Sequence, residues 1–375
     1  MSPISALFFL PDLGGGGAQR TMLNLAAAMP RDLVDLTLAV GTAKGEAMEW
    51  IAPGLKFHDL GASRLIKAAV PLARLIHSSR PDVVLSTMMD ANVIASVSRA
   101  MARSDAALVL RETNSQSARP ELGRLRKSLA RIAYRRADCV VALSEGVRRE
   151  LIADLALDES KTITIPNPVF VDAIQRKIES ARAKAAPEGF GAGYPHIVAV
   201  GRLHGQKGFD VLLRGLEQVP GAHVTILGEG AERGALERLA EQLGVASRVH
   251  LPGFVKDTAP YLAHADLFVL SSRWEGFGHV IVEAMAAGLP VVATDCPYGP
   301  ADIIQDGETG RLVKPEDAAD LARTIGEVLS DDALSRRLAA AGVTAARRYE
   351  SDRVAREYAT MLKQVASARN RVQTR

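Results

Sequence analysis

The segment LFVLSSRWEGFGHVIVEAMAAGLPVVAT, residues 267–294, decides the fold of this chain. Its first four and last four residues, Leu267–Leu270 and Val291–Thr294, are short apolar runs that predict buried strands. The stretch between them has helical periodicity, and glycines and a proline mark its two turns. A strand, a helix and a second strand in this order predict a parallel sheet covered by helices.

The same alternation continues on both sides of this segment. The other expected strands are Leu7–Leu10, Val34–Val40, Val83–Ser86, Leu108–Arg111, Val140–Leu143, Thr162–Ile165, His196–Val200, Val224–Leu227 and Val249–Leu251. A helix is expected over Ala231–Leu243, with Gly244 placed to cap its end. We therefore predict an α/β fold of two doubly wound, Rossmann-like domains, with the ligand beyond the carboxyl ends of the strands.

Length supports two domains, because 375 residues and 40.0 kDa exceed what one compact domain usually holds. Pro166-Asn167-Pro168 and the glycine-rich stretch 187–193 are the clearest break in composition. The helical stretch Ser351–Ala368 follows the second domain, and we expect it to cross back to the first. The predicted divisions are 1–168, a linker 169–194, 195–350 and a C-terminal helix 351–375.

Composition excludes several classes of protein. A hydrophobic fraction of 47% and a charged fraction of 24% indicate a globular chain, and a net charge of +3 gives no argument for nucleic-acid binding. Residues 1–168 hold 21 basic and 17 acidic side chains, so the positive excess lies in the first half. Cys139 and Cys296 form no disulfide framework, and no apolar run approaches the ~18 residues of a membrane span. We expect a cytoplasmic protein.

Four glycines, Gly14–Gly17, stand between the first expected strand and a helix. They remove side chains where the backbone could approach a ligand, and the helix start offers free amides. Strand-to-helix turns also use glycine for packing, so this motif alone leaves both interpretations open. It lacks the Gly-x-Gly-x-x-Gly spacing and the later acidic residue of dinucleotide enzymes, which disfavours a nicotinamide oxidoreductase.

The loop Gly201–Gly208 follows the first strand of the second domain and carries Arg202 and Lys207. Two cations at a strand's carboxyl end could hold a diphosphate, the arginine with its planar fork and the lysine as a point charge. The spacing is not that of a Walker loop. A solvated loop is an equally good interpretation of the pattern alone.

Two carboxylates, Glu275 and Glu283, are eight residues apart around the turn Gly276-Phe277-Gly278. Glu283 falls among apolar helical residues, where a carboxylate is costly unless it accepts hydrogen bonds such as those of a ribose diol. The amides at the helix start can hold sugar hydroxyls or phosphate oxygens. A surface or capping role is the usual explanation for one glutamate, but it explains the whole segment poorly.

Taken together, the motifs resemble the retaining GT-B glycosyltransferases of family 4. The resemblance rests on the Glu-x7-Glu motif, the Gly-Arg-Leu…Lys-Gly loop and the glycine-rich first turn. The other matching segments are Ser144-Glu145-Gly146, Ile165-Pro166-Asn167-Pro168 and Asp306-Gly307-Glu308-Thr309-Gly310. The stretch Thr294–Pro300 is similar to a loop of members that build bacterial surface polysaccharides and glycan carriers.

The resemblance implies an acceptor side in the first domain and a nucleotide-sugar site in the second. It assigns Arg202 and Lys207 to the diphosphate, Glu275 to the transferred sugar and Glu283 to the ribose. The other donor-binding residues that it implies are Gly16, Gly17, Val255, Gly276, Phe277 and Gly278. Many relatives have a histidine near the sugar where this chain has Arg111-Glu112-Thr113-Asn114. Arg111 and Asn114 are therefore the candidates on the acceptor side.

Two expectations concern what lies around the site. No Asp-x-Asp occurs in the sequence, so the carboxylate pair that commonly carries a divalent metal to the donor is missing, and we expect neither a metal nor a further cofactor. The stretch 124–136 is basic, without acids, and has leucines at helical spacing. It is either a solvated surface helix or a patch that docks on anionic lipid through Arg124, Arg126, Lys127, Arg131 and Arg135.

The sequence therefore predicts a retaining transferase that moves a sugar from a nucleotide donor to a glycan or lipid-linked hydroxyl, in polysaccharide or glycoconjugate synthesis. No nucleic-acid partner is expected, and a peripheral position on the inner face of the cytoplasmic membrane is a hypothesis. The alternative function is a non-catalytic nucleotide-sugar-binding partner of a glycan synthesis complex. Presence of all four candidate residues, Arg202, Lys207, Glu275 and Glu283, argues against a decayed site.

Overall fold

The computed structural model describes residues 2–14, 16–113, 124–191 and 193–373. The chain forms two compact units, the first made of residues 1–168 and 351–375 and the second of residues 169–350. It leaves the first unit after Pro168 and returns to it at Ser351. The helix α14 (Ser351–Gln373), which we expected to cross back, belongs to the first unit.

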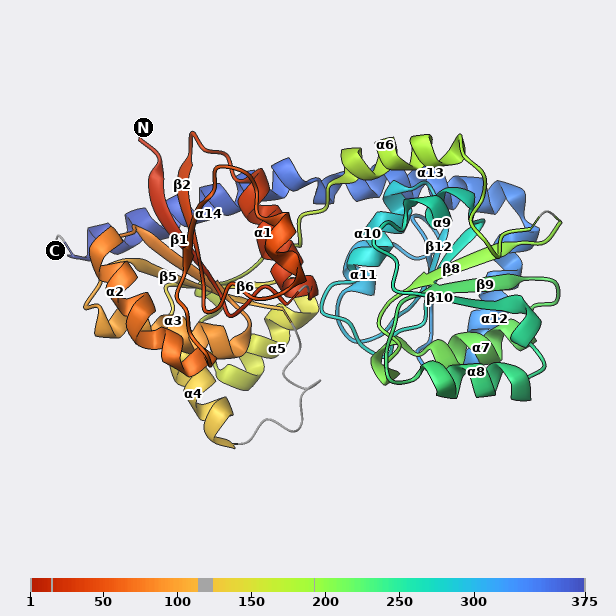
Figure 1. The fold of residues 1–375 in the computed structure, drawn as a ribbon, viewed down its shortest axis with the longest axis horizontal. Coiled ribbons are helices and arrows are strands. Elements are labelled where there is room, and N and C mark those ends of the chain that lie inside the picture. Colours follow the sequence, from red (N-terminus) through yellow and green to blue (C-terminus); the bar gives the residue numbers. More distant parts are fainter. Residues whose placement is uncertain (1, 15, 114–123, 192, 374–375) are drawn as a thin grey trace. The chain divides into compact units, whose positions relative to one another are not determined.

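The first unit contains one parallel sheet in the order β3-β2-β1-β4-β5-β6-β7 (Figure 1). Its strands are β1 (Ile4–Leu10), β2 (Val34–Val40), β3 (Lys56–Asp59), β4 (Val83–Thr87), β5 (Ala107–Glu112), β6 (Cys139–Ala142) and β7 (Thr162–Thr164). Six were expected from their apolar runs. The sequence did not predict β3, because this edge strand, KFHD, has only four residues and a mostly polar composition.

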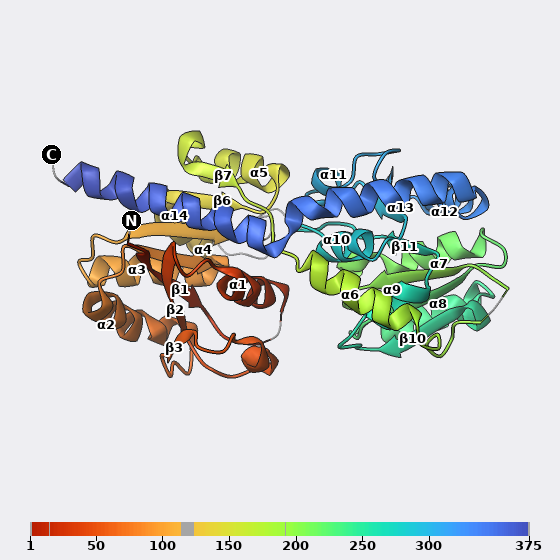
Figure 2. The ribbon, with the colours of Figure 1, turned by 90° about the horizontal axis from the view of Figure 1, so that it is seen from above.

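Helices cover both faces of this sheet. Its helices are α1 (Gly17–Ala28), α2 (Ala69–Ser79), α3 (Met89–Met101), α4 (Arg124–Arg135) and α5 (Glu145–Leu155), with short 3-10 turns η1 (Glu46–Trp50), η2 (Leu65–Ala68) and η3 (Glu159–Lys161). The helices α2, α3, α4 and α5 pack side by side, whereas α14 packs against α1, β4 and β5. Figures 1 and 2 show α14 lying along the sheet. Its buried face, which includes Val354, Tyr358 and Leu362, belongs to the same core as the strands.

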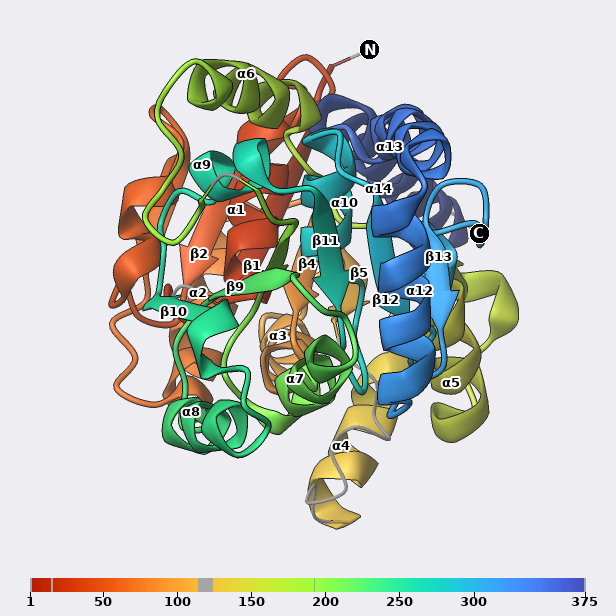
Figure 3. The same cartoon turned by 90° about the vertical axis from the view of Figure 1, so that its right-hand side faces the viewer.

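The second unit has a six-stranded parallel sheet in the order β10-β9-β8-β11-β12-β13, and the labelled strands follow one another from β10 to β13 across Figure 3. Its strands are β8 (His196–Val200), β9 (His223–Leu227), β10 (Val249–Gly253), β11 (Leu267–Leu270), β12 (Val291–Thr294) and β13 (Arg311–Val313). Five follow the predicted alternation. The sequence did not predict β13, an edge strand of only three residues.

The helices of this unit are α6 (Val171–Arg182), α7 (Phe209–Glu217), α8 (Arg233–Gln242), α9 (Ala259–His264), α10 (His279–Ala286), α11 (Pro300–Ile303), α12 (Ala318–Ser330) and α13 (Asp332–Ala346), with η4 (Gly205–Lys207), η5 (Ala246–Arg248) and η6 (Arg347–Tyr349). The stretch 169–194, which we expected to be a linker, belongs to this unit. Within it α6 packs on α9 and α10 and buries Val171, Ile178 and Ala181. The sequence did not predict this packing, because most residues of α6 are charged or polar and only a few form its apolar face.

Candidate active site

The loops after β8, β9, β10 and β11 gather at one edge of the second sheet, because parallel strands end on the same side. Their backbones are in close contact. A Cβ atom on Gly228 would lie 1.9 Å from the carbonyl oxygen of Gly201, and one on Gly230 would lie 2.1 Å from that of Leu203. Only glycine fits at these two positions, so the loop that carries Arg202 is held against the loop after β9.

An ion pair joins the two central site residues. The ammonium of Lys207, in η4 after β8, lies 2.5 Å from Oε1 of Glu275, in the loop after β11. The Lys207 side chain is 18% exposed and that of Glu275 is 8% exposed. The hydroxyl of Ser272 also donates to Glu275 Oε1, at 2.6 Å. The resemblance assigned Lys207 to the diphosphate and Glu275 to the transferred sugar. In the structure the two side chains contact each other.

The backbone around this pair fixes its geometry. Gly208 has a φ of +59°, and a Cβ there would lie 2.1 Å from the carbonyl oxygen of Ser271. The Ser271 hydroxyl donates to the carbonyl oxygen of Lys207 at 2.9 Å. Glycine at position 208 is therefore required both by its left-handed conformation and by the neighbouring strand end. The lysine is held at the end of β11 as a result.

Arg273 braces the two loops and had no predicted role. Its guanidinium donates to both carboxylate oxygens of Asp210 at 2.8 Å and to the carbonyl oxygen of Gly205 at 2.7 Å, and it also pairs with Glu316. These hydrogen bonds lower the pKa of Asp210 below its usual value. The sequence offered one indication of this contact, because Asp210 is an acid in the first turn of the helix that follows the lysine loop. The side chain of Gln206 adds a bond to the carbonyl oxygen of Trp274 at 2.9 Å.

The turn Gly276-Phe277-Gly278 is buried and leads into α10. Gly278 caps the helix with a φ of +94°. The Phe277 ring makes edge contacts with His279 and Tyr349, at centroid distances of 5.4 Å in both cases. A Cβ on Gly299 would lie 2.3 Å from the carbonyl oxygen of Phe277, so the loop after β12 packs against this turn. The turn and the helix start are thus firmly positioned.

Glu283 and Val255 lie at the places that the sequence indicated. Glu283 is in α10, half-buried, with Val282 and Ala284 buried on either side of it. Val255 follows β10 and is half-buried. Glu283 lies about one turn into α10, among apolar residues, as the sequence indicated.

Arg202 contrasts with Lys207. Its side chain is exposed, and it makes no hydrogen bond or ion pair with any residue that the structure describes. An arginine in this state keeps its five N–H donors available for the non-bridging oxygens of an anion such as a diphosphate. The 201–208 loop therefore carries Lys207, which is paired with Glu275, and Arg202, which has no partner among the described residues.

In the first unit, Gly16 and Gly17 form the turn between β1 and α1. Gly16 has a φ of −70°, and a Cβ on Gly17 would meet nothing within 4 Å. Asp12 steadies the turn by accepting hydrogen bonds from the Gly14 amide at 2.8 Å and from the Gln19 side chain at 2.9 Å. The local backbone therefore does not itself require glycine at position 17.

Arg111 does not occupy the predicted acceptor position. It is only 1% exposed, and its guanidinium donates to the hydroxyls of Tyr358 at 3.2 Å and Thr87 at 2.9 Å and to the side-chain oxygen of Asn167. These contacts fasten α14 and the end of the first unit to β5, so its placement argues against contact with an acceptor. The other acceptor-side candidate, Asn114, lies outside the described residues.

The five predicted patch cations have different surroundings. Arg124 is the first residue of α4. Arg126 pairs with Asp90 at 2.7 Å, and Arg131 donates to the carbonyl oxygens of Asp154 and Leu155 at 3.3 Å, at the end of α5. Lys127 and Arg135 are exposed and have no hydrogen bond or ion pair within the described chain. Only part of the predicted patch is therefore free to meet a ligand.

The described residues contain no cluster of three or more histidine, cysteine or acidic side chains arranged to hold a metal ion. None of their helices combines the length and the apolar character needed to span a bilayer.

Comparison with known proteins identifies the chain. Residues 180–344 match the family described as glycosyl transferases group 1, and residues 15–173 match glycosyltransferase family 4. The lipopolysaccharide core biosynthesis glycosyltransferase LpsE of Rhizobium meliloti is 30% identical over 333 residues, which cover 87% of this chain and 89% of LpsE. An N-acetylgalactosaminyltransferase of Campylobacter jejuni that acts on a diphospho-undecaprenol-linked sugar is 27% identical over 233 residues, covering 62% of this chain and 61% of its own.

The fold comparison agrees. The structure of Anabaena HepE with UDP-glucose has a TM-score of 0.83 at 21% identity and covers 96% of this chain and all of its own. WaaG, a glycosyltransferase involved in lipopolysaccharide biosynthesis, has a TM-score of 0.72 at 18% identity and covers 95% of this chain and 99% of its own. Two Rossmann-like domains of this kind define the GT-B class, as predicted. The chain belongs to the glycosyl transferases of group 1, family 4.

Proposed function

We propose that this glycosyltransferase moves a sugar from a nucleoside-diphosphate donor to a hydroxyl of a glycan or lipid-linked acceptor during lipopolysaccharide or other polysaccharide assembly. The observation that carries the proposal is the ion pair of Lys207 and Glu275, together with Arg202 of the same 201–208 loop, which has no partner within the described chain. LpsE and the Campylobacter transferase support the acceptor class by their own names.

The chemistry assigns a separate task to each charge. Arg202 binds diphosphate oxygens with its unused donors, and Lys207 contributes its remaining two N–H groups to the same oxygens. Glu275, oriented by Ser272, has its second oxygen for a hydroxyl of the transferred sugar. Glu283 accepts hydrogen bonds from the ribose. Fixed cations and helix amides then stabilise the charge that develops on the leaving diphosphate.

We propose that the reaction retains the anomeric configuration and needs no divalent metal. The bond between the acceptor oxygen and the anomeric carbon forms on the face from which the diphosphate departs, and the hydroxyl proton passes to the departing phosphate oxygen. Retention follows from the family resemblance. Metal independence is supported by the lack of an Asp-x-Asp sequence together with the two cations of the 201–208 loop.

One binding and turnover screen tests this function. UDP-, GDP- and ADP-sugars are titrated against the protein with and without EDTA, and products from a mixture of lipid-linked and glycan acceptors are examined by proton NMR. We expect one nucleotide series to bind, transfer to persist in EDTA, and the new linkage to keep the donor's configuration. Binding without turnover on any acceptor would favour the non-catalytic partner, and loss of transfer in EDTA would overturn metal independence.

A peripheral position at an anionic membrane is the second part of the proposal. The helix α4 exposes Leu129 (46%) and Ile132 (50%) together with Lys127 and Arg135, which form no ion pair with any residue that the structure describes. Exposed apolar side chains among cations are typical of helices that lie in a lipid interface, where each cation contributes ~1 kcal/mol near an anionic surface. A lipid-linked acceptor would be reached from that position.

A further inference from the structure

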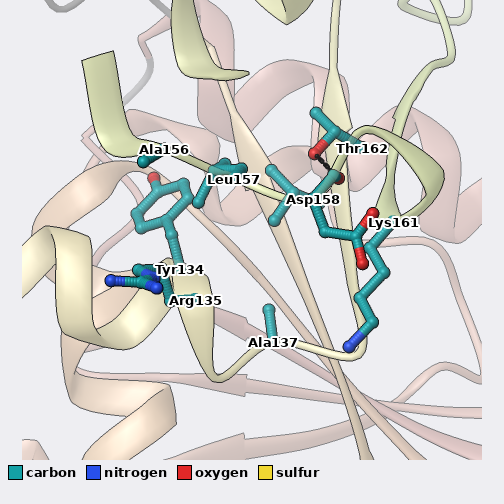
Figure 4. A pocket seen from close by; sticks show the side chains of 9 residues that line it. Tyr134, Arg135, Ala137, Ala156, Leu157, Asp158, Lys161 and Thr162 are labelled. Carbon is teal, nitrogen blue, oxygen red and sulfur yellow. Dashed lines mark hydrogen bonds between the residues drawn. The ribbon is translucent and has the colours of Figure 1, made fainter. Parts of the chain in front are cut away.

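A cavity of about 340 Å³ lies in the first unit, and Figure 4 shows the side chains that line it. It is bordered by the ends of α4 and α5, by η3 and by the first part of β6 and β7. The strands of this sheet are parallel, so the cavity is at their amino-terminal edge, whereas Gly16 and Gly17 follow the carboxyl end of β1. It is therefore separate from the turn to which the sugar phosphate was assigned.

Two cations line this cavity without an ion-pair partner. Arg135 and Lys161 are exposed, and neither side chain has a hydrogen bond or ion pair within the described chain. Figure 4 shows Arg135 beside Tyr134 and Lys161 on the other side, with Ala137 and Leu157 between them. Two cations that share one cavity raise its potential for an anion.

The single acidic residue among those that line the cavity is already satisfied. Asp158 accepts hydrogen bonds from the amide and the hydroxyl of Ser160, at 2.9 and 2.7 Å, and these bonds lower the pKa of its carboxyl group. It therefore stays ionised, and the Lys161 charge contributes to the lowering, but the two side chains form no ion pair. The lining side chains retain one net positive charge.

The walls of the cavity are held in place by contacts elsewhere. Tyr134 is 1% exposed, and its hydroxyl accepts a hydrogen bond from Asn92 at 2.7 Å and donates to Glu112. Arg131 joins α4 to the end of α5 through the carbonyl oxygens of Asp154 and Leu155. A ligand would thus enter a site whose shape exists before binding.

The surroundings favour a lipid over a soluble anion. Ile132 and Leu129 lie one and two turns before Arg135 on α4, and both are about half exposed. An anion from solution gains nothing from apolar side chains exposed on the same helix, whereas a phospholipid brings acyl chains to them. The apolar side chains suit the acyl chains of a phospholipid, and the cationic cavity suits its phosphate headgroup.

We propose that the cavity between α4 and α5 binds the phosphate headgroup of an anionic phospholipid, with Arg135 and Lys161 as its cationic contacts. This site rests on the membrane association proposed above and adds a defined position to it. Leu129 and Ile132 contact the acyl region while the headgroup enters the cavity. The protein would then be oriented, as well as attracted, at the membrane.

The test compares two variants of the full chain with equal change in charge. Arg135→Gln/Lys161→Gln removes the cavity cations. Lys127→Gln/Arg136→Gln removes one exposed cation of α4 and one that directly follows it, neither of which lines the cavity. Both are measured for sedimentation with vesicles of phosphatidylcholine alone and with added phosphatidylglycerol. Thermal melting checks folding. Calorimetry with glycerol 1-phosphate tests whether the cavity binds a soluble phosphate monoester instead of a lipid headgroup.

The cavity variant should lose at least about ten-fold more affinity for phosphatidylglycerol vesicles than the matched variant. Equal losses, or no loss in either, would overturn the site while leaving general membrane attraction intact. Glycerol 1-phosphate binding that depends on Arg135 and Lys161, without a difference on vesicles, would assign the cavity to a soluble anion and overturn the lipid. Donor binding by the wild-type protein, measured without vesicles, tests the transferase proposal separately.

Discussion

The ammonium of Lys207 lies 2.5 Å from Oε1 of Glu275, and both side chains are largely withdrawn from solvent. An ion pair in such a place is costly to desolvate and gains its value from good geometry and further hydrogen bonds. Ser272 supplies one such bond to the same oxygen. The pair therefore supports the fold of the site and also keeps the lysine ready beside the expected diphosphate.

Replacing Lys207 by glutamine should affect both stability and activity. The change leaves the Glu275 charge without its cation, and we expect unfolding to become easier by up to about 3 kcal/mol. Transfer should fall at least about 100-fold because the diphosphate loses a cation. Chemical denaturation and initial rates with the donor found in the screen measure the two effects.

The control is the double variant Lys207→Gln/Glu275→Gln, which removes both charges. It should recover most of the lost stability, because no buried charge is left unpaired, and it should remain inactive. A double variant as active as the wild-type protein would contradict the assigned roles.

Arg202→Gln should separate activity from stability. The side chain is exposed and has no partner in the described chain, so the free energy of unfolding should change by less than about 0.5 kcal/mol. The KM for the donor should rise at least about ten-fold through loss of a bidentate contact. Steady-state kinetics measure this, and an unchanged KM would show that Arg202 does not bind the donor.

Much of the fold could be predicted because parallel strands covered on both faces appear as continuous apolar runs. That signal is strong for strands such as β11 and β12. It is weak for the edge strands β3 and β13, which are short and partly polar. The helix α6 was interpreted as a linker because its charged face dominates the composition.

Spacing along one segment could place Glu275 in the loop after β11 and Glu283 in the helix that follows it. Contacts between side chains from separate loops could not be predicted. The contact of Arg273 with Asp210 spans 63 residues, and the Arg111 contact with Tyr358 spans 247. Arg111 became an acceptor-side candidate because relatives have a histidine in this strand-end segment, but its burial and its bonds to Tyr358, Thr87 and Asn167 indicate a structural role.

Tyr358→Phe should loosen the attachment of α14. The hydroxyl accepts a hydrogen bond from Arg111, and its loss leaves a buried guanidinium N–H without that partner, at a cost of about 1–3 kcal/mol. Urea denaturation measures the change. Tyr261→Phe is the matched control, because no hydroxyl bond of Tyr261 occurs within the described chain, and equal stability of the two variants would contradict the role of this contact.

Both cysteines should be unreactive in the folded protein. Burial raises the pKa of the Cys139 and Cys296 thiols to about 12, and the Glu275 charge contributes at Cys296. At pH 8 the thiolate fraction would be about 10⁻⁴. A disulfide reagent should therefore detect no thiol in the native protein and two after denaturation. Rapid native labelling would show that one site opens.

The same two groups predict the response to alkali. A thiol whose pKa is higher in the folded state than in the unfolded state stabilises the fold fully below the unfolded value and loses this contribution as pH rises through the folded one. Stability should thus decline from about pH 9 toward pH 12. Cys139→Ala/Cys296→Ala should flatten that decline in denaturation curves, and an unchanged slope would contradict the shifts.

Gly17→Ala tests the glycine turn of the first unit. A Cβ at position 17 meets nothing within 4 Å, so stability should be unchanged or rise by up to about 1 kcal/mol from the better helix propensity of alanine. If a sugar phosphate approaches this backbone, the added methyl group occupies its space and donor affinity falls. Gly326→Ala, also in open space within a helix, is the control. Because the fold itself does not require glycine at position 17, an unchanged KM for the donor would assign this glycine no part in binding.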